Sequence, residues 1–334
     1  MTQKRRRLTL RDVAEVAGVS EMTVSRVLRG SGVVSARSRA HIISVVEKMG
    51  YVQNQLAGSL ATTRSNQIAV IIPSLVNNVF TEVMEGITLE LEKADYHAIV
   101  GISGYSLQKE EALLYSMMSW RPAGIIVPNI YHTQKTRNML ASSGVPVVEM
   151  MSLTDTPIDM CVGLDQRAAS REIARYLLSR GYKRFGYVGW NEEDYSAADR
   201  FEEIRLLIED AGLEIIAPDL FASPPNFADG KRGLSRLLDI APDLDAVIFS
   251  NDTAATGGMM HCIEAGIRIP HDLAIAGFSG LPTGQNMPQK LTTIVTKRHD
   301  IGRVSARSII RGLEGAPTTA ISDLKFELNK GQTA

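Results

Sequence analysis

Residues 9–30 read TLRDVAEVAGVSEMTVSRVLRG. Thr9 and Asp12 have the spacing of a capping box, which predicts that a short helix begins at residue 10. Gly18 readily adopts a positive φ and ends this helix, and the side chain of Ser20 caps a second helix. Two short helices joined by such a tight glycine-containing turn are typical of a helix-turn-helix motif.

The second helix is expected over residues 21–28, and a third over about 36–49, ending at Gly50. Apolar side chains recur at helical spacing in both, so each helix has one face for a shared core. The second helix leaves five side chains on its other face, namely Glu21, Met22, Ser25, Arg26 and Arg29. These observations predict an all-α helix-turn-helix domain over residues 8–50.

Charge is divided unevenly along the chain. The 334 residues carry a net charge of −1, which by itself argues against a nucleic-acid partner. Residues 1–64, however, contain 11 Lys and Arg against 4 Asp and Glu, a net +7, whereas residues 65–334 contain 25 against 33, a net −8. A basic segment attracts DNA by releasing counterions from the phosphates, so we expect the N-terminal part to bind double-stranded DNA.

Residues 9–30 resemble the signature of the lactose-repressor (LacI) family of bacterial transcription regulators. The resemblance implies that the second helix enters the major groove. By matching position it assigns base contacts to Glu21, Met22 and Arg26, and phosphate contacts to Thr9, Ser20, Thr23 and Ser25. Arginine can bind guanine with two hydrogen bonds, and methionine offers apolar contact, for example to a thymine methyl group. Glu21 has two interpretations: an acceptor for cytosine N4, or a first-turn residue that stabilises the helix dipole.

Residues 50–65, GYVQNQLAGSLATTRS, are similar to the hinge of the same family. The resemblance implies a hinge over residues 51–65 with a hinge helix at about 54–62, in which Ala57 and Leu60 match the apolar wedge that enters the minor groove. Such a wedge unstacks bases and gains a bent duplex with more contact. Gln53 stands where the family commonly has proline, and this replacement of proline loosens the linker. The alternative is that Leu60 belongs to a plain interdomain linker.

From residue 67 onward, strand-like and helix-like segments alternate. Strands are expected at residues 68–72, 98–102, 125–127, 145–150, 185–189, 246–250 and 273–278, and helices at residues 79–94, 107–119, 133–141, 166–179, 201–210, 254–265 and 300–311. Continuous apolar strands alternating with helices indicate parallel sheets that are buried on both faces. Because roughly 270 residues are too many for one such sheet, we expect two lobes with a ligand at the carboxyl ends of the strands.

The resemblance spans essentially the whole chain and implies the same architecture. The expected fold is an N-terminal all-α helix-turn-helix domain plus an α/β, two-lobed, periplasmic-binding-protein-like core with three crossovers between its lobes. Residues 66–334 would then form an effector-binding and dimerisation domain. The sequence has no terminal leucine heptads, so we expect a homodimer without a coiled-coil tetramerisation tail.

The sequence lacks the motifs of several other protein classes. It contains no phosphate-binding loop, no dinucleotide-binding glycine motif, no HExxH and no GxSxG, so we expect no enzyme and no cofactor. Cys161 and Cys262 stand far apart without metal-ligand spacing, which predicts reduced thiols, no metal site and a cytoplasmic protein. The apolar stretches are too short to cross a membrane, and residues 4–7 lack the apolar run of a signal peptide.

In this family, small polyols, sugars or purines bind between the lobes. By matching position the resemblance implies ligand contacts from Ser74, Phe80, Arg200, Asn251 and Asp252, with Phe227 as an aromatic wall. Phe80 has the alternative of a core residue, and Asp252 that of capping a helix that begins near residue 253. Arg200, expected at a loop-to-helix junction, can bind a carboxylate or phosphate with its planar fork.

Phe278, Ser279 and Gly280 stand where sugar-binding members commonly have an aromatic residue followed by two aspartates. Ser279 is expected to contact the ligand from this position. A cleft that lacks this carboxylate and keeps Arg200 favours an anionic ligand. The segments IIPSLVNNVFTEVMEGI (71–87), VPVVEMM (145–151) and AIAGFSG (274–280) resemble the gluconate-operon repressor branch of the family. Glu149 is expected near the cleft, where it would bind ligand hydroxyls or pair with a cation.

These observations lead to one hypothesis with several alternatives. The preferred interpretation is a dimeric repressor that binds a pseudo-palindromic operator and responds to gluconate, a related aldonate or its phosphorylated form. The first alternative is a regulator of the same family that responds to a neutral sugar or another small metabolite. The others are a sugar-acid-binding protein and a sugar-acid enzyme such as a kinase.

Overall fold

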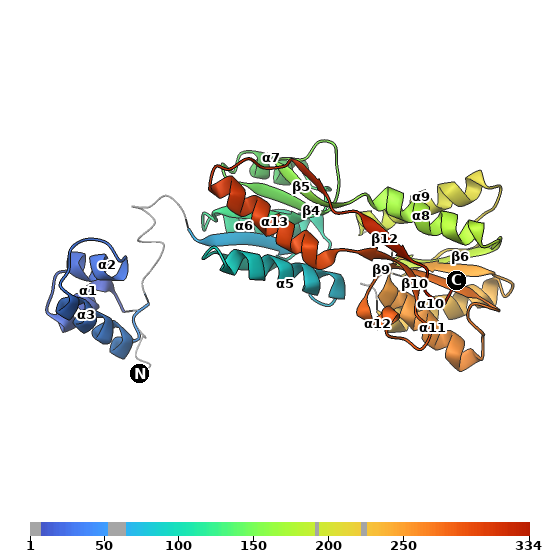
Figure 1. Ribbon diagram of the computed structural model, residues 1–334, viewed down its shortest axis with the longest axis horizontal. Coiled ribbons are helices and arrows are strands. Elements are labelled where there is room, and N and C mark those ends of the chain that lie inside the picture. The colour runs from blue at the N-terminus through green and yellow to red at the C-terminus, as the bar shows by residue number, and fades with distance from the viewer. Residues whose placement is uncertain (1–7, 53–64, 191–193, 222–225) are drawn as a thin grey trace. The chain divides into compact units, whose positions relative to one another are not determined.

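The computed structural model describes residues 8–52, 65–190, 194–221 and 226–334. They form two compact units, which divide between Ser65 and Asn66 (Figure 1). The expected hinge helix, with Ala57 and Leu60, lies outside the described residues, so the hinge remains a prediction.

The first unit contains three helices. They are α1 (Leu10–Ala17), α2 (Glu21–Leu28) and α3 (Ala36–Met49). Thr9 forms the expected capping box, and Gly18 ends α1 in the left-handed conformation with a φ of 66°. Val13, Val24 and Ile42, one from each helix, are fully buried in a shared core. The unit is the helix-turn-helix fold that the sequence predicts.

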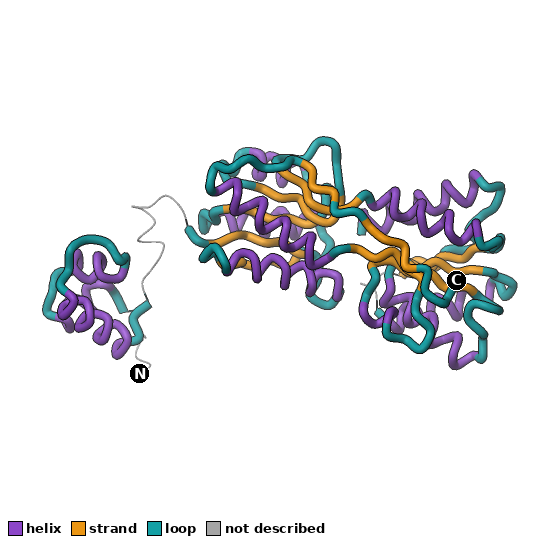
Figure 2. The backbone as a smooth tube through the Cα atoms, viewed as in Figure 1, coloured by secondary structure: helices purple, strands orange, loops and turns teal. Residues whose placement is uncertain are grey.

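The second unit contains two six-stranded sheets (Figure 2). The first sheet, in the order β11-β5-β4-β3-β1-β2, consists of β1 (Gln67–Ile72), β2 (His97–Ile102), β3 (Gly124–Pro128), β4 (Val147–Ser152), β5 (Met160–Leu164) and β11 (Ile321–Asp323). The second, in the order β12-β10-β9-β8-β6-β7, consists of β6 (Phe185–Trp190), β7 (Asp219–Phe221), β8 (Ala246–Phe249), β9 (Ala274–Ser279), β10 (Thr292–Thr296) and β12 (Phe326–Asn329). Neighbouring strands are parallel except for β12, which runs antiparallel to β10.

Helices cover both faces of each sheet. Lobe 1 is the first sheet with α5 (Asn78–Glu92) and α13 (Arg298–Leu313) on one face and α6 (Leu107–Met118) and α7 (Gln134–Ala141) on the other. Lobe 2 is the second sheet with α8 (Gln166–Ser179), α9 (Tyr195–Asp210), α10 (Phe227–Ile240), α11 (Asp252–Ala265) and the short α12 (Pro282–Gln285). In β1, Ile68 and Val70 belong to the core under α5 and α13, whereas Ala69 and Ile71 belong to the core under α6 and α7. Burial on both faces explains why the strands are apolar throughout.

The chain passes between the lobes three times among the described residues: from β5 to α8, from β10 to α13, and from β11 to β12 (Figure 1). The middle passage lets α13 pack on α5 at very short range. A Cβ atom added to Gly302 would lie 2.0 Å from the Val83 carbonyl oxygen, and one added to Gly86 would lie 2.1 Å from the His299 carbonyl oxygen. The two helices therefore pack backbone against backbone, although they come from opposite ends of the unit's sequence.

The structure corrects several expected elements. The sequence did not predict β5, β7, β10, β11, β12 or α10, and β7, β11 and β12 have only three or four residues, too few for a periodic pattern. Helix α9 was expected from residue 201 but begins at Tyr195, because the Asp194 side chain caps it. Arg200 therefore lies inside α9 and not at a loop-to-helix junction.

Lobe 1 contains a buried charged cluster formed by His132, Glu110 and Glu149, called here the His132 cluster. Nδ1 of His132 lies 2.6 Å from Oε1 of Glu110, and Nε2 lies 3.5 Å from Oε1 of Glu149, with all three side chains at most 4% exposed. The other oxygen of Glu149 accepts a hydrogen bond of 2.6 Å from the backbone N–H of Ile158. Burial lowers the pKa of His132, but the two carboxylates outweigh burial and raise this pKa to about 9. The imidazole is therefore protonated near neutral pH.

This raised pKa predicts how stability depends on pH. Folding favours the protonated imidazole, so the contribution of His132 is complete below its unfolded pKa of about 6.5 and is lost as the pH rises through about 9. We expect the free energy of unfolding to fall over this range by up to roughly 3 kcal/mol, at about 1.4 kcal/mol per pKa unit. Urea denaturation at a series of pH values measures the free energy of unfolding over this range.

The matched variants are His132→Gln and His271→Gln. The first removes the buried imidazole and should flatten the decline between pH 6.5 and 9, whereas the second changes a histidine whose side chain is 73% exposed and should keep it. An equal slope in His132→Gln and the unmodified protein would contradict this account of the His132 cluster.

Candidate functional site

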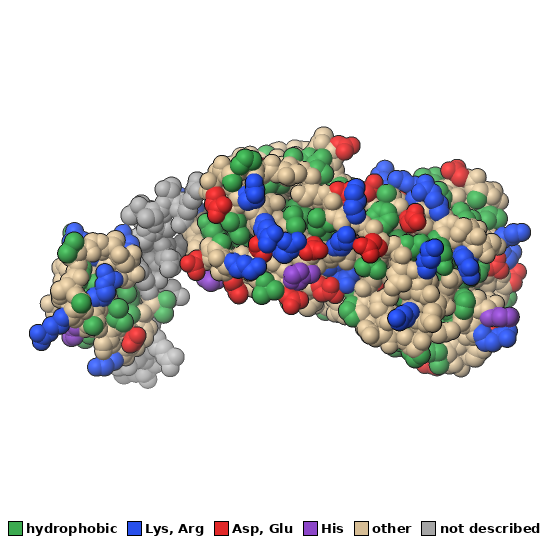
Figure 3. Space-filling model, viewed as in Figure 1, with side chains coloured by type: hydrophobic (Ala, Val, Ile, Leu, Met, Phe, Trp, Pro, Cys, Tyr) green, Lys and Arg blue, Asp and Glu red, His purple; other side chains and the backbone are tan. Residues whose placement is uncertain are grey.

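One face of α2 in the first unit is open to solvent. Glu21, Met22 and Arg26 are exposed there, and Met22 retains 63% of its surface. Met22 and Arg26 are four residues apart and therefore lie on the same side of the helix. In Figure 3 blue Lys and Arg side chains outnumber red Asp and Glu side chains on the visible face of this unit. This surface has the charge and the side-chain types that contact with DNA requires.

The four expected phosphate-contacting residues differ in position. Thr9 caps α1, and the Ser20 and Thr23 hydroxyls lie 2.9 Å apart at the start of α2. Helix N-termini present free backbone N–H groups that suit a phosphate. Ser25 is only 9% exposed, and its Oγ accepts a hydrogen bond from Nη2 of Arg29. The Ser25 hydroxyl still has its own proton to donate, and the phosphate contacts of all four residues remain predictions.

The second unit has a cavity between its lobes with an empty volume of about 630 Å³, part of it open to solvent. Its lining comes from Asn77, Val79, Phe80, Tyr105, Asn129 and Met151 in lobe 1 and from Gln166, Asp194, Ser196, Arg200, Ser250, Asn251, Phe278, Ser279 and Thr296 in lobe 2. The lining combines apolar side chains with a few polar groups, as small-molecule sites do. Four of the expected ligand-contacting residues line this cleft: Phe80, Arg200, Asn251 and Ser279. Phe80 is also packed in the lobe 1 core, as its alternative interpretation states, and its contact with a ligand remains a prediction.

Arg200 is the only positively charged side chain among the described residues that line the cleft. Its Nη1 donates to Oε1 of Gln166 and its Nη2 to the Ser250 carbonyl oxygen, each over 3.3 Å. The guanidinium lies 4.6 Å from the ring centre of Phe278. Its Nε is buried and makes no hydrogen bond within the described chain. Arg200 is thus held in one orientation, and one of its N–H groups has no partner among the described residues.

Ser250 provides a second unpaired group beside it. The residue is 3% exposed, and its Oγ has no hydrogen-bond partner among the described residues. A buried polar atom without a partner costs free energy unless a ligand or water satisfies it. Asn251, the next residue, caps α11 by accepting from the Ala254 N–H over 2.9 Å. The Arg200 side of the cleft therefore offers unpaired hydrogen-bonding groups from two side chains.

The lobe 1 wall contains polar residues that the sequence analysis missed. Asn77, Tyr105 and Asn129 each follow the carboxyl end of a strand, β1, β2 and β3 respectively. Nδ2 of Asn77 donates to the Tyr105 hydroxyl over 2.8 Å, and Oδ1 of Asn129 accepts from Ser196 of lobe 2 over 2.7 Å. Their positions after successive apolar strands are a signal in the sequence, because such residues meet at one edge of a parallel sheet.

Further contacts join the lobes beside the cleft. The Tyr131 hydroxyl of lobe 1 donates to Oδ2 of Asp199 in α9. The same ring stacks on Tyr195 with centres 5.2 Å apart. Tyr131 precedes His132, so the His132 cluster positions the loop that makes these contacts. The lobes are therefore in direct contact through side chains in addition to the three chain passages.

Four expected ligand-contacting residues do not line the cleft. Ser74 is 7% exposed, and its Oγ accepts from the backbone N–H groups of Val76 and Asn77, so it shapes the loop before α5. Phe227 begins α10 and is 39% exposed at a surface away from the lining. Glu149 lies in the His132 cluster, where it pairs with a cation as its alternative interpretation proposed. The fourth residue is Asp252.

Asp252 is fully buried behind the cleft and holds a turn of lobe 2. Its Oδ2 accepts from the Leu281 N–H and its Oδ1 from the Thr293 hydroxyl, both over 2.6 Å. Burial raises the pKa of Asp252 to about 6, although these two hydrogen bonds oppose the increase. The helix cap expected of Asp252 is supplied by Asn251 instead, and Asp252 is the first residue of α11.

Two general features can be stated for the described part of the chain. No cluster of three or more His, Cys, Asp or Glu side chains there is arranged to hold a metal ion. No helix there is both long enough and apolar enough to cross a membrane.

Two family models match this chain. Residues 9–54 match the bacterial regulatory proteins of the lacI family, and residues 65–326 match the periplasmic binding proteins and sugar binding domain of the LacI family. The second match alone covers more than half of the chain. The two matched segments correspond to the helix-turn-helix unit and the two-lobed unit.

Similar proteins extend over almost the whole chain. The HTH-type transcriptional regulator GntR of Escherichia coli strain K12 is 32% identical over 331 residues, 98% of this chain and 99% of that protein. GntR of Pseudomonas aeruginosa is 33% identical over 328 residues, 96% of this chain and 94% of that protein.

Two solved structures of similar sequence share the fold of this chain. A LacI-family transcriptional regulator from Silicibacter pomeroyi has a TM-score of 0.93 at 42% identity over 98% of this chain and 99% of that chain. The transcription regulator GntR from Chromobacterium violaceum has a TM-score of 0.76 at 34% identity over 80% of this chain and 98% of that chain. With an exposed basic helix-turn-helix unit and a polar cleft between two lobes, this chain belongs to the LacI family of DNA-binding transcription regulators and is not an enzyme.

Proposed function

We propose that this regulator is a repressor of sugar-acid catabolism genes, that it acts in the cytoplasm as a homodimer on a pseudo-palindromic operator, and that its effector is gluconate or a related sugar acid. The observation that carries the proposal is the Arg200 guanidinium in the cleft, which keeps an unpaired Nε. Relatives named GntR, at 32–33% identity, support the same effector class.

The anionic end of the effector is assigned to lobe 2. A carboxylate beside Arg200 would accept from Nε, and the Ser250 hydroxyl lies on the same wall of the cleft. Ser279 occupies the position at which sugar-binding members of the family commonly have an aspartate, whose carboxylate would repel an anionic ligand. Hydrogen bonds to a charged group contribute about 1.5–3 kcal/mol each, more than neutral ones. This arrangement favours an acid over a neutral sugar of the same length.

The remaining length of a sugar acid would lie against lobe 1. Asn77, Tyr105 and Asn129 offer amide and hydroxyl groups to the ligand's hydroxyls, and Val79 and Phe80 offer apolar contact. A ligand that touches both lobes binds the closed arrangement better than an open one, and that difference in affinity can shift operator binding. Coupling of this kind is typically about 1–3 kcal/mol.

The DNA-binding side of the proposal rests on α2. Arg26 and Met22 are exposed on one side of that helix and would reach base edges, and Glu21 precedes them in its first turn. The Thr9, Ser20 and Thr23 hydroxyls would contact phosphates. In a two-fold dimer these contacts are repeated in a second half-site, and the hinge residues Ala57 and Leu60 are proposed as the minor-groove wedge between the half-sites.

A second candidate function is a response to a neutral sugar. Asp194 lines the cleft with Arg200, and a carboxylate can accept hydrogen bonds from sugar hydroxyls. Calorimetry with gluconate, its 6-phosphate and glucose separates the two candidates, because only the charged ligands use the Arg200 guanidinium fully.

Arg200→Ala should weaken gluconate binding at least tenfold, since it removes a charge-assisted hydrogen bond worth about 1.5–3 kcal/mol. Isothermal titration calorimetry measures the dissociation constant. Arg205→Ala is the matched control, because Arg205 lies on the same helix and pairs with Glu202 and Glu209 at the surface. An unchanged gluconate affinity in Arg200→Ala would show that the anion is held elsewhere.

Arg26→Ala should cost about 1–3 kcal/mol of specific DNA binding, as expected for the loss of a two-bond base contact. The measurement compares a duplex selected from a random pool with an unselected duplex of equal length. Arg11→Ala is the control, because Arg11 is an exposed arginine of α1 that pairs with Glu15. Equal losses on both duplexes would mean that Arg26 contacts only phosphate.

A further inference from the structure

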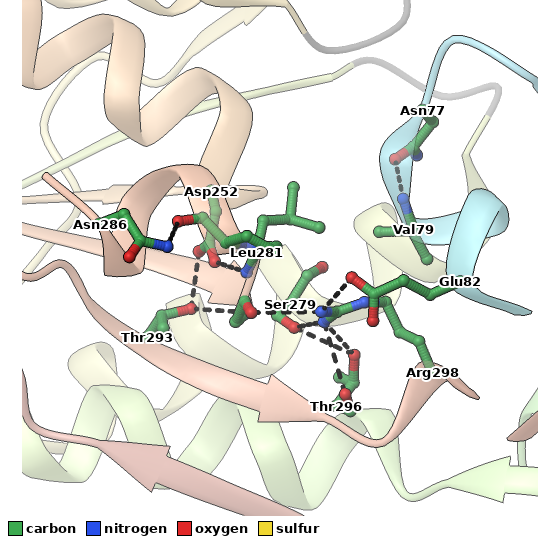
Figure 4. A network of polar contacts seen from close by, with 12 residues as sticks. Asn77, Val79, Glu82, Asp252, Ser279, Leu281, Asn286, Thr293, Thr296 and Arg298 are labelled. Carbon is green, nitrogen blue, oxygen red and sulfur yellow. Dashed lines mark hydrogen bonds and ion pairs between the residues drawn. The ribbon is translucent and has the colours of Figure 1, made fainter. Parts of the chain in front are cut away.

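Arg298 is a buried cation at the middle passage between the lobes. It is the first residue of α13, directly after the chain has left β10 for lobe 1, and it is 5% exposed. Its guanidinium contacts both lobes (Figure 4). Burying an arginine costs free energy unless its donors are bonded, so these contacts are needed for its position.

On the lobe 2 side, Arg298 holds the turn of residues 279–281, called here the 279–281 turn. Its Nη1 donates to the Ser279 carbonyl oxygen and to Oγ1 of Thr296, the latter over 3.3 Å, and its Nη2 donates to the Gly280 carbonyl oxygen over 3.2 Å. The turn has positive φ angles at Ser279 (115°) and Gly280 (70°). Serine rarely adopts such an angle, so the surrounding contacts must fix it.

Asp252 holds the same turn from the opposite side. It accepts from the Leu281 N–H, one residue after the carbonyl groups that Arg298 binds. A buried anion and a buried cation thus fix three successive residues of the turn (Figure 4). Because Ser279 lines the cleft, the shape of the turn sets part of the wall that faces a ligand.

On the lobe 1 side, Nη2 of Arg298 lies 2.9 Å from Oε1 of Glu82 in α5. Glu82 comes shortly after Val79 and Phe80, which line the opposite wall of the cleft. Helix α5 packs backbone against backbone on α13 through Gly86 and Gly302, so the two helices have little freedom to slide. Glu82 and the start of α13 therefore belong to one rigid part of lobe 1.

We propose that Arg298 is a positioning residue that couples the cleft to lobe 1: one guanidinium holds the 279–281 turn of lobe 2 and the Glu82 carboxylate of lobe 1, so a ligand that moves either wall moves the other. The proposal rests on the proposed function for the identity of the ligand, but the contacts themselves do not depend on that identity. Arg298 does not line the cleft, so its effect on the ligand is indirect.

The competing interpretation is that Arg298 only closes the ends of β9 and β10 within lobe 2. In that case the hydrogen bonds to Ser279, Gly280 and Thr296 stabilise lobe 2, and the ion pair with Glu82 has no effect on the response to a ligand. The two interpretations differ for Glu82→Gln, which changes none of the lobe 2 partners of Arg298 and removes only the charge of its lobe 1 partner.

The test compares Glu82→Gln with Glu85→Gln in the full chain. Glu85 lies on the same helix, is exposed, and makes no ion pair in the described part of the chain. Operator affinity is measured with and without saturating gluconate, and gluconate affinity is measured by calorimetry. Gluconate changes operator affinity by a certain factor, and in Glu82→Gln we expect this factor to be at least about fivefold smaller than in the unmodified protein. Gluconate affinity itself should stay within about threefold of the unmodified protein, which is less than the tenfold change that corresponds to about 1.4 kcal/mol. Glu85→Gln should keep both values.

Arg298→Lys is the second variant. Lysine keeps the charge but lacks the planar fork that reaches both carbonyl oxygens and the carboxylate together. It should lower the affinity ratio as Glu82→Gln does. An unchanged ratio in Glu82→Gln, or in Arg298→Lys, overturns the proposal.

A measurement without ligand separates this inference from the proposed function. Hydrogen exchange followed by mass spectrometry should show faster exchange at the amides of residues 279–286 in Glu82→Gln and not in Glu85→Gln. If the unmodified protein does not respond to gluconate, the proposed effector is wrong and this exchange measurement decides the inference alone. Unchanged exchange in Glu82→Gln would then overturn it.

Discussion

A parallel sheet that is buried on both faces leaves polar side chains few places except beyond the ends of its strands. In this protein β1, β3 and β8 are apolar and almost wholly buried along their length. Polar residues of the cleft follow these strands: Asn129 directly after β3, Ser250 directly after β8, and Asn77 in the loop after β1. Because the carboxyl ends of the strands in both lobes border the same cleft, hydrophobic burial of the sheets also collects the hydrogen-bonding groups of the ligand site.

The few charges that do lie inside the lobes each have a partner, and each has a positional role. Glu149 pairs with His132 and fixes the loop that carries Tyr131 to lobe 2. Asp252 and Arg298 fix the 279–281 turn from its two sides. An apolar pair would fill the same space at lower desolvation cost, so these charges are explained better by the geometry they impose than by net stability.

Local signals in the sequence were sufficient where capping and strong periodicity act together. Thr9 and Gly18 fix the two ends of α1 and Ser20 fixes the start of α2, and the helices begin and end at these points as predicted. Short edge strands such as β11 could not be predicted, because three residues are too few to show an alternating apolar pattern. Their position is set by pairing with a neighbouring strand. The sequence predicts Glu149 near the cleft, bound to ligand hydroxyls or paired with a cation. Only the fold reveals that His132, from a separate loop, provides its counter-charge.

The way the lobes are joined explains how a small ligand can control a protein of this size. Beyond the three chain passages, the described side-chain bridges include Tyr131 with Asp199, Asn129 with Ser196, and Arg298 of α13 with the Gly280 carbonyl oxygen of lobe 2. Each net hydrogen bond of this kind is worth about 1 kcal/mol, rising to about 1.5–3 when a charge takes part. The arrangement of the lobes is therefore held by a few kcal/mol, which is the size of the difference that one ligand can supply.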